Sequence, residues 1–175
     1  VQAYACLVAI MSRGQGYHRI AEKRLYEASL KNNFPSPIVS SAGALIDSLH
    51  QIGAKKVSII CPYMKPLTQL VVDYIESEGI EVQDFMALEI ADNLEVAAQD
   101  PNAPAELWKK LDVNGVDAII ASACVQMPSL SSIEKIEKAS GLPTLSAAVA
   151  TTRSILHTLK LNPVAPGGGA LLAAR

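Results

Sequence analysis

Short apolar runs alternate with helix-like segments along most of the chain. The β-branched run at residues 57–61 predicts a strand. Behind it, apolar side chains at positions 67, 70, 71, 74 and 75 have the spacing of an amphipathic helix, and Pro66 suits its first turn. Gly79 is predicted to end this helix, and a new strand is predicted to open at Ile80.

The alternation continues on both sides of this unit. Further strands are predicted at residues 1–5, 116–121 and 143–145, and further helices at residues 107–114, 128–138 and 149–159. Strands that alternate with helices form βαβ units, in which the strands are parallel. The sequence therefore predicts an α/β fold with small parallel sheets flanked by helices.

A weak internal repeat relates two segments that lie 106 residues apart. Residues 37–40 (Pro-Ile-Val-Ser) and 143–146 (Pro-Thr-Leu-Ser) each lead into a helix-like segment. An apolar run that ends in Ala-Cys precedes each copy, at Cys6 and at Cys124. A pseudo-twofold protein would show such a repeat, with both cysteines facing one cleft, whereas chance similarity of short Ala- and Ser-rich segments is the alternative.

Composition excludes several classes of protein. The 175 residues are 50% hydrophobic and 18% charged, which is enough apolar material for one folded domain or two small ones. A net charge of −2 argues against a nucleic-acid partner, which would need a clustered basic excess. Charged residues interrupt every apolar stretch well before the roughly 20 residues that span a membrane, so no membrane partner is expected.

The three cysteines are far apart and form no CxxC or Cys/His metal pattern. We therefore expect reduced thiols and a cytoplasmic protein. In open α/β sheets, chemistry lies in the loops that follow the strands, and both Cys6 and Cys124 follow predicted strands. Backbone N–H groups at such positions stabilise a thiolate. Two inert, buried thiols are the alternative, and a structural role is favoured for Cys61.

Two other loops carry candidate ligand-binding side chains. Tyr63 lies in a Pro-flanked turn that opens a helix, where its hydroxyl could donate to an anion or simply pack as a half-buried aromatic. Asn93 could bind a ligand or cap a helix. The histidines, at positions 18, 50 and 157, fall in predicted helices, where a solvated or capping role is expected. No motif indicates NAD, ATP, flavin or a metal, so no cofactor is expected.

Four tracts together resemble a known family. They are residues 5–9 (Ala-Cys-Leu-Val-Ala), 62–67 (Pro-Tyr-Met-Lys-Pro-Leu), 90–94 (Ile-Ala-Asp-Asn-Leu) and 122–130 (Ser-Ala-Cys-Val-Gln-Met-Pro-Ser-Leu). In these tracts the chain is similar to the maleate cis–trans isomerases of the aspartate/glutamate racemase superfamily. The related arylmalonate decarboxylases resemble the second cysteine but carry glycine in place of the first.

The resemblance implies two pseudo-twofold-related lobes with the active site in the cleft between them. The second lobe would span residues 42–140, and the first would comprise residues 1–41 and 141–175. Family members carry further residues before the position of Val1, which supply the first strands and a substrate-binding asparagine. We therefore expect the first lobe of this chain to be incomplete. A homodimer is expected as well.

The resemblance also implies a reaction and its residues. Cys6 would be the nucleophile that adds to maleate, and Cys124 the acid and base that moves the proton. Tyr63 and Asn93 would donate to the substrate carboxylates, together with the backbone N–H groups of Leu7, Val8 and Val125. The side chains of Val8 and Met127 would form an apolar wall. The alternatives are an amino-acid racemase acting on aspartate, glutamate or a hydantoin, an arylmalonate-type decarboxylase, or a non-catalytic module that binds a small ligand.

Overall fold

The computed structural model describes residues 1–174. Its strands are β1 (Gln2–Tyr4), β2 (Ile38–Ser40), β3 (Lys56–Cys61), β4 (Glu81–Ala87), β5 (Ala118–Ser122) and β6 (Thr144–Ser146). Its α-helices are α1 (Leu7–Met11), α2 (Tyr17–Lys31), α3 (Ser41–Gln51), α4 (Lys65–Ser77), α5 (Asn93–Ala97), α6 (Pro104–Leu107), α7 (Leu130–Ser140) and α8 (Ala147–Thr158). Two short 3-10 helices are η1 (Trp108–Lys110) and η2 (Gly169–Leu172).

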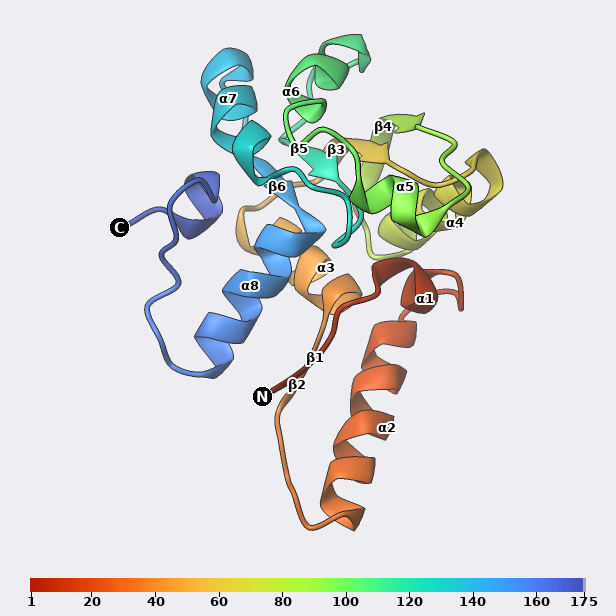
Figure 1. The fold of residues 1–175 in the computed structure, drawn as a ribbon, viewed down its shortest axis with the longest axis vertical. Coiled ribbons are helices and arrows are strands. Elements are labelled where there is room, and N and C mark those ends of the chain that lie inside the picture. Colours follow the sequence, from red (N-terminus) through yellow and green to blue (C-terminus); the bar gives the residue numbers. More distant parts are fainter. Residues whose placement is uncertain (175) are drawn as a thin grey trace.

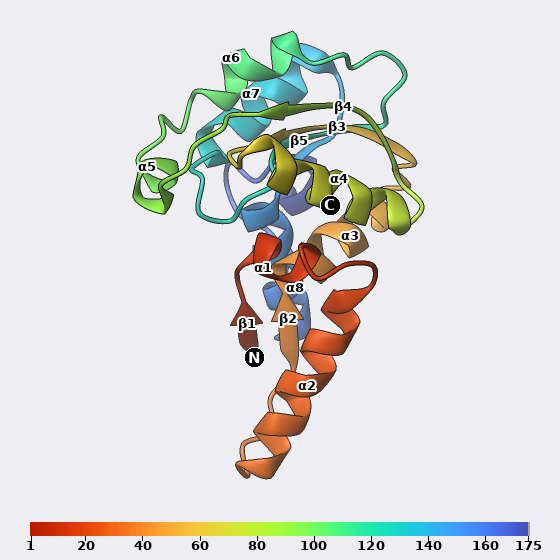
Figure 2. The same ribbon diagram turned by 90° about the vertical axis from the view of Figure 1, so that its right-hand side faces the viewer.

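The strands form two parallel sheets, which confirms the predicted α/β class. One sheet has four strands in the order β4-β3-β5-β6, and the other consists of β1 and β2. The four-stranded sheet forms the upper body of the molecule, and β1, β2 and α2 extend from it (Figures 1 and 2). Helices α1, α3 and α8 lie between these two parts (Figure 2).

The internal repeat is confirmed in the strand pairing. In the small sheet Tyr4 lies opposite Ser40, and in the large sheet Ser122 lies opposite Ser146. Ser40 and Ser146 are the N-caps of α3 and α8. Each side chain accepts a hydrogen bond from the backbone N–H three residues later. The helices of the two copies, α3 and α8, pack against each other. The two strand pairs are therefore equivalent, and each places its cysteine two residues after the strand ends.

Most predicted elements are confirmed, with two corrections. The helix predicted at residues 107–114 is instead the short α6 followed by η1, and the chain is already extended at Leu111. His18 lies in a helix as expected, but its predicted solvated or capping role is wrong, because its side chain is 4% exposed. His50 and His157 are exposed and occupy the last turns of α3 and α8.

The division into two lobes stays a prediction. Hydrogen bonding places β6 at the edge of the four-stranded sheet, although the predicted second lobe ends at residue 140. The following helix, α8, packs on α3 at the junction with the smaller part. The chain thus crosses between the two parts close to Ser146, just as it does close to Ser40 in the equivalent copy.

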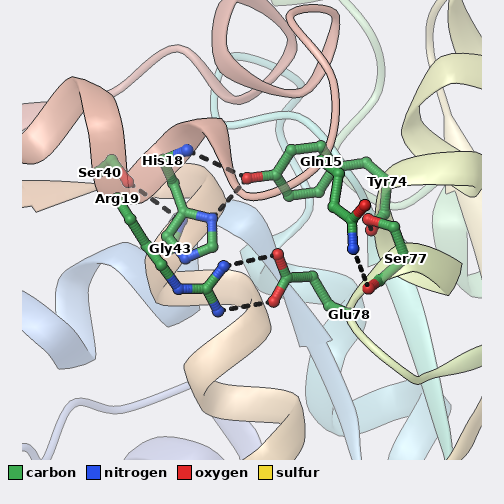
Figure 3. Close-up of polar contacts among 8 residues, drawn as sticks. All are labelled: Gln15, His18, Arg19, Ser40, Gly43, Tyr74, Ser77 and Glu78. Atoms are coloured by element: carbon green, nitrogen blue, oxygen red, sulfur yellow. Dashed lines mark hydrogen bonds and ion pairs between the residues drawn. The ribbon is translucent and has the colours of Figure 1, made fainter.

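A buried polar cluster joins α2 to α4 (Figure 3). The backbone N–H of His18 donates to the hydroxyl of Tyr74 at 3.1 Å, and the same hydroxyl pairs with His18 Nδ1. Beside it, the guanidinium of Arg19 forms two parallel hydrogen bonds to the Glu78 carboxylate, at 2.7 and 2.8 Å. Burial lowers the pKa of His18, which favours the neutral ring. The cluster fixes the start of α2 against the end of α4.

Within residues 1–174, no helix is both long and apolar enough to cross a membrane. The same part of the chain contains no group of three or more His, Cys, Asp or Glu side chains that could hold a metal ion.

Candidate active site

Cys6 lies at the junction between β1 and α1. It is the N-cap of α1, it is exposed, and its thiol makes no capping hydrogen bond. Leu7 and Val8 form the first turn of this helix, where backbone N–H groups have no acceptor within the helix. The Leu7 side chain is buried in the main core and Val8 packs against that core, so this turn is anchored. The thiol therefore faces open space beside unused N–H donors.

Cys124 lies at the equivalent position after β5, but it is buried, with 7% of its surface exposed. The Ser122 hydroxyl fixes the turn in two ways: it donates to the Cys124 carbonyl at 2.9 Å and accepts from the Cys124 N–H at 3.3 Å. The Ala123 N–H donates to the carbonyl of Ile60 at 2.9 Å. Sequence reasoning did not single out Ser122. The Ser-x-Cys spacing at the end of a predicted strand is the signal that could have identified it.

Tyr63 is bonded to the turn that carries Cys124. Its hydroxyl donates to the Ala123 carbonyl at 3.1 Å, directly beside Cys124. Burial raises the pKa of the Tyr63 hydroxyl, and the neighbouring thiols of Cys124, Cys61 and Cys6 raise it further. The hydroxyl therefore stays protonated and available as a donor.

Cys61 differs from the other two cysteines. It is completely buried at the end of β3 and belongs to the main core. Burial raises the pKa of its thiol, with the nearby Cys124 adding to the effect. A buried, protonated thiol is not a nucleophile, and Cys61 is completely enclosed by the core, which fits the structural role favoured for it.

Asn93 begins α5, and the alternative that it caps this helix is wrong. The cap is Asp92, whose carboxylate accepts from the Leu94 N–H at 2.6 Å. Asn93 is exposed, and its backbone carbonyl accepts a hydrogen bond from Gln126 Nε2 at 2.7 Å. Its amide side chain is therefore not needed for the helix start, and it lies on a segment that contacts the Cys124 loop.

The remaining predicted residues, Val125 and Met127, belong to the loop that carries Cys124. Met127 is 1% exposed and packs with Cys124, Ile60 and Val96 in a separate apolar cluster. Val125 is half-buried against the main core. Both residues also line a cavity of about 250 Å³ between this loop and the start of α8. Cys124 thus packs among apolar groups, with the hydroxyls of Ser122 and Tyr63 bonded to its loop.

The sequence matches known proteins over nearly its whole length. The family model described as arylmalonate decarboxylase matches residues 2–172. A maleate isomerase of Pseudomonas putida is 53% identical over 173 residues, which cover 99% of this chain and 69% of the relative. A maleate isomerase of Geobacillus stearothermophilus is 53% identical over 175 residues, covering 100% of this chain and 70% of the relative.

The chain belongs to the maleate isomerase family. Solved structures of maleate isomerases share its fold closely. An alanine variant of the Pseudomonas putida enzyme, crystallised with maleate, is 54% identical and superposes with a TM-score of 0.96, covering 99% of this chain and 69% of that one. A cysteine-to-serine variant from Nocardia farcinica is 42% identical with a TM-score of 0.94, over 97% of this chain and 69% of that one. That structure holds a covalently bound succinylcysteine intermediate.

Arylmalonate decarboxylase shares the fold at a greater distance. A glycine-to-cysteine mutant of that enzyme is 18% identical, with a TM-score of 0.83 over 97% of this chain. At this identity the likeness concerns the fold alone. Enzymes with a different activity therefore share this fold, so the chemistry of this chain has to be argued from its own residues.

Proposed function

We propose that this protein converts maleate into fumarate without a cofactor, through a covalent bond between the substrate and Cys6. The observation that carries the proposal is the hydrogen bond from the buried Tyr63 hydroxyl to the Ala123 carbonyl, which places a donor directly beside Cys124. The two cysteines occupy equivalent positions after β1 and β5, in two strand pairs related by the internal repeat. This supports an arrangement in which a small planar substrate lies between them.

The reaction needs a way to remove the π bond, because that bond blocks rotation in maleate. The Cys6 thiolate adds to one alkene carbon: a C–S bond forms, and the π electrons move to the other carbon and its carboxylate. The Cys124 thiol protonates that second carbon, which leaves a succinyl thioether whose central single bond rotates. The Cys124 thiolate then takes a proton back from the same carbon, the C–S bond breaks, and fumarate leaves.

The two thiols differ in ways that suit these roles. Cys6 is exposed at a helix start, where a substrate can reach it and where the N–H groups of Leu7 and Val8 have no acceptor within the helix. Cys124 is buried among apolar groups, in the turn whose Ala123 carbonyl accepts from Tyr63. Cys6 is therefore placed to meet the substrate, and Cys124 to exchange a proton where water has little access.

The main obstacle is the charge of the substrate. Maleate is a dianion and the nucleophile is an anion, and two like charges about 4 Å apart repel by about 4 kcal/mol at an effective dielectric constant of 20. Donors must offset this repulsion. We assign this task to the side chains of Tyr63 and Asn93 and to the N–H groups of Leu7, Val8 and Val125. In this scheme the Tyr63 hydroxyl exchanges the Ala123 carbonyl for a carboxylate oxygen.

Apolar side chains complete the proposed site. Val8 and Met127 form a wall that excludes water, so that the intermediate eliminates and is not diverted. The burial of Met127 beside Cys124 supports this role.

The test is fumarate formation from maleate, followed by proton NMR with purified protein and no added cofactor. Cys6→Ala is expected to abolish turnover, and Cys124→Ser to slow it by orders of magnitude. Cys61→Ala is the matched control, because it removes the buried third thiol and is expected to retain most of the turnover. Wild-type protein that forms no fumarate, or a Cys6→Ala variant that turns over at the wild-type rate, would refute the proposal.

Two further properties belong to the same proposal. A thiolate nucleophile requires a reducing compartment, which supports the cytoplasm as the place of action. A homodimer is proposed as well, and the exposure of Leu70 on the outer face of α4 supports a contact there. Light scattering of the purified protein would decide between monomer and dimer.

A further inference from the structure

One side chain of the Cys124 loop, defined as residues 123–129, reaches across to α5. Gln126 Nε2 donates to the backbone carbonyl of Asn93 at 2.7 Å. The two residues follow different strands, β5 and β4, which lie on either side of β3 in the sheet. The loop after β3 carries Tyr63, so this hydrogen bond joins the segments that flank Tyr63. Figures 1 and 2 show α5 beside the Cys124 loop.

The orientation of α5 depends on contacts of this kind. The helix has five residues, which is far below the length at which an isolated helix is stable in water. Within the helix, Leu94 is 78% exposed, and Val96 is the buried side chain, in the apolar cluster that contains Cys124 and Met127. Packing therefore holds one point of α5, and hydrogen bonds must fix the rest.

The segment before α5 is fixed on the other side, to the Tyr63 loop. The Ile90 N–H donates to the Pro62 carbonyl at 2.9 Å, and the Glu89 N–H donates to the Tyr63 carbonyl at 3.2 Å. These backbone bonds place the approach to α5 relative to Tyr63. The bond from Gln126 supplies the corresponding attachment to the Cys124 loop.

We infer that Gln126 is a positioning residue, which sets the place of Asn93 relative to Cys124. The inference rests on the proposed function, in which Asn93 holds a substrate carboxylate while Cys124 moves a proton on the adjoining carbon. Both steps act on one small substrate, so the separation of the two residues has to match it. A misplacement of about 1 Å in such a site can cost about 10²-fold in rate.

The test removes the amide of Gln126 in two ways. Gln126→Ala deletes the side chain, and Gln126→Glu keeps its length but turns a donor into a carboxylate that faces a carbonyl oxygen. Gln99→Ala is the matched control. Gln99 Nε2 also donates to a backbone carbonyl, that of Glu95 at 3.0 Å, but this bond stays within the α5 segment.

Two readouts are needed, one of them independent of turnover. We expect both Gln126 variants to raise KM for maleate about tenfold with a smaller change in kcat, because the contact between Asn93 and a carboxylate is made in the ground state as well. Hydrogen exchange of the backbone amides in residues 93–98 is expected to become faster in the same variants. Gln99→Ala is expected to keep the wild-type KM.

The outcomes separate this inference from the proposed function. Unchanged KM in the Gln126 variants refutes the positioning role, whether or not hydrogen exchange changes. An equal rise of KM in Gln99→Ala also refutes it, because the effect would then be general loosening of α5. If the wild-type protein forms no fumarate, the proposed function fails and the inference fails with it.

Discussion

Replacing Tyr63 by Phe separates a catalytic hydroxyl from a structural one. The variant removes one oxygen, the hydroxyl that donates to the Ala123 carbonyl at 3.1 Å beside Cys124. One lost hydrogen bond lowers the free energy of unfolding by about 1 kcal/mol, which corresponds to about 2–4 °C in Tm for a chain of this size. Removal of a preorganised donor to developing charge costs about 10²–10³-fold in kcat. The expected result is a large loss of turnover with a small loss of stability.

Tyr74→Phe is the matched control, because it also removes a buried hydroxyl. That hydroxyl contacts the His18 N–H and the His18 ring nitrogen, both outside the proposed site (Figure 3). Two polar groups lose their partner, so we expect a loss of about 2 kcal/mol and about 4–8 °C in Tm. Turnover is expected to stay near wild type.

The assays are kcat for fumarate formation and Tm by calorimetry, measured on both variants in the same buffer. We expect opposite patterns: turnover falls far more in Tyr63→Phe, and stability falls more in Tyr74→Phe. A Tyr63→Phe variant that keeps its turnover and loses several degrees of Tm would show that Tyr63 has a structural role alone.

Other perturbations test the fold that holds the site. The folded-state pKa of His18 is lowered by burial, so its contribution to stability is present above the unfolded value of about 6.5 and is lost as pH falls from there toward the folded value. Tm should therefore drop between about pH 7.5 and about pH 5, and His18→Asn should reduce that drop. An equal drop in the variant would show that His18 is not its cause. Gly43→Ala should lower the free energy of unfolding by about 1–3 kcal/mol and with it the denaturant midpoint. The new Cβ would lie 2.6 Å from Glu22 Oε1 and 3.1 Å from the His18 ring. An unchanged midpoint would mean that α2 shifts away from α3 without cost.

Local patterns were sufficient to predict the strands and the positions of both cysteines. The strands at residues 57–61 and 143–145 are marked by β-branched residues and by neighbouring prolines, which act within a few residues. The repeat was visible because serine caps recur after each short strand, at Ser40 and Ser146. Such signals fix where a strand ends, and in a parallel sheet that is where a site forms.

Long-range partners could not be predicted in the same way. His18 and Tyr74 are 56 residues apart, and their pairing results from how α2 packs against α4. The bond between Gln126 and Asn93 spans 33 residues and depends on the sheet order. Leu107, Trp108 and Leu111 have helical spacing, which predicts a helix that continues past Leu111. In the structure, Leu111 is extended and still packs with the other two side chains in one apolar cluster. In each case tertiary packing overrides local periodicity.

The most direct test of the account is the mass of the protein after it reacts with maleate. In the Cys124→Ser variant, water supplies the proton that completes the thioether, but no thiolate is present to take a proton back, so the thioether should accumulate. The account predicts a mass increase of one maleic acid, located by peptide mapping on Cys6. An adduct on Cys61, or no adduct in a variant that still binds maleate, would contradict the covalent mechanism.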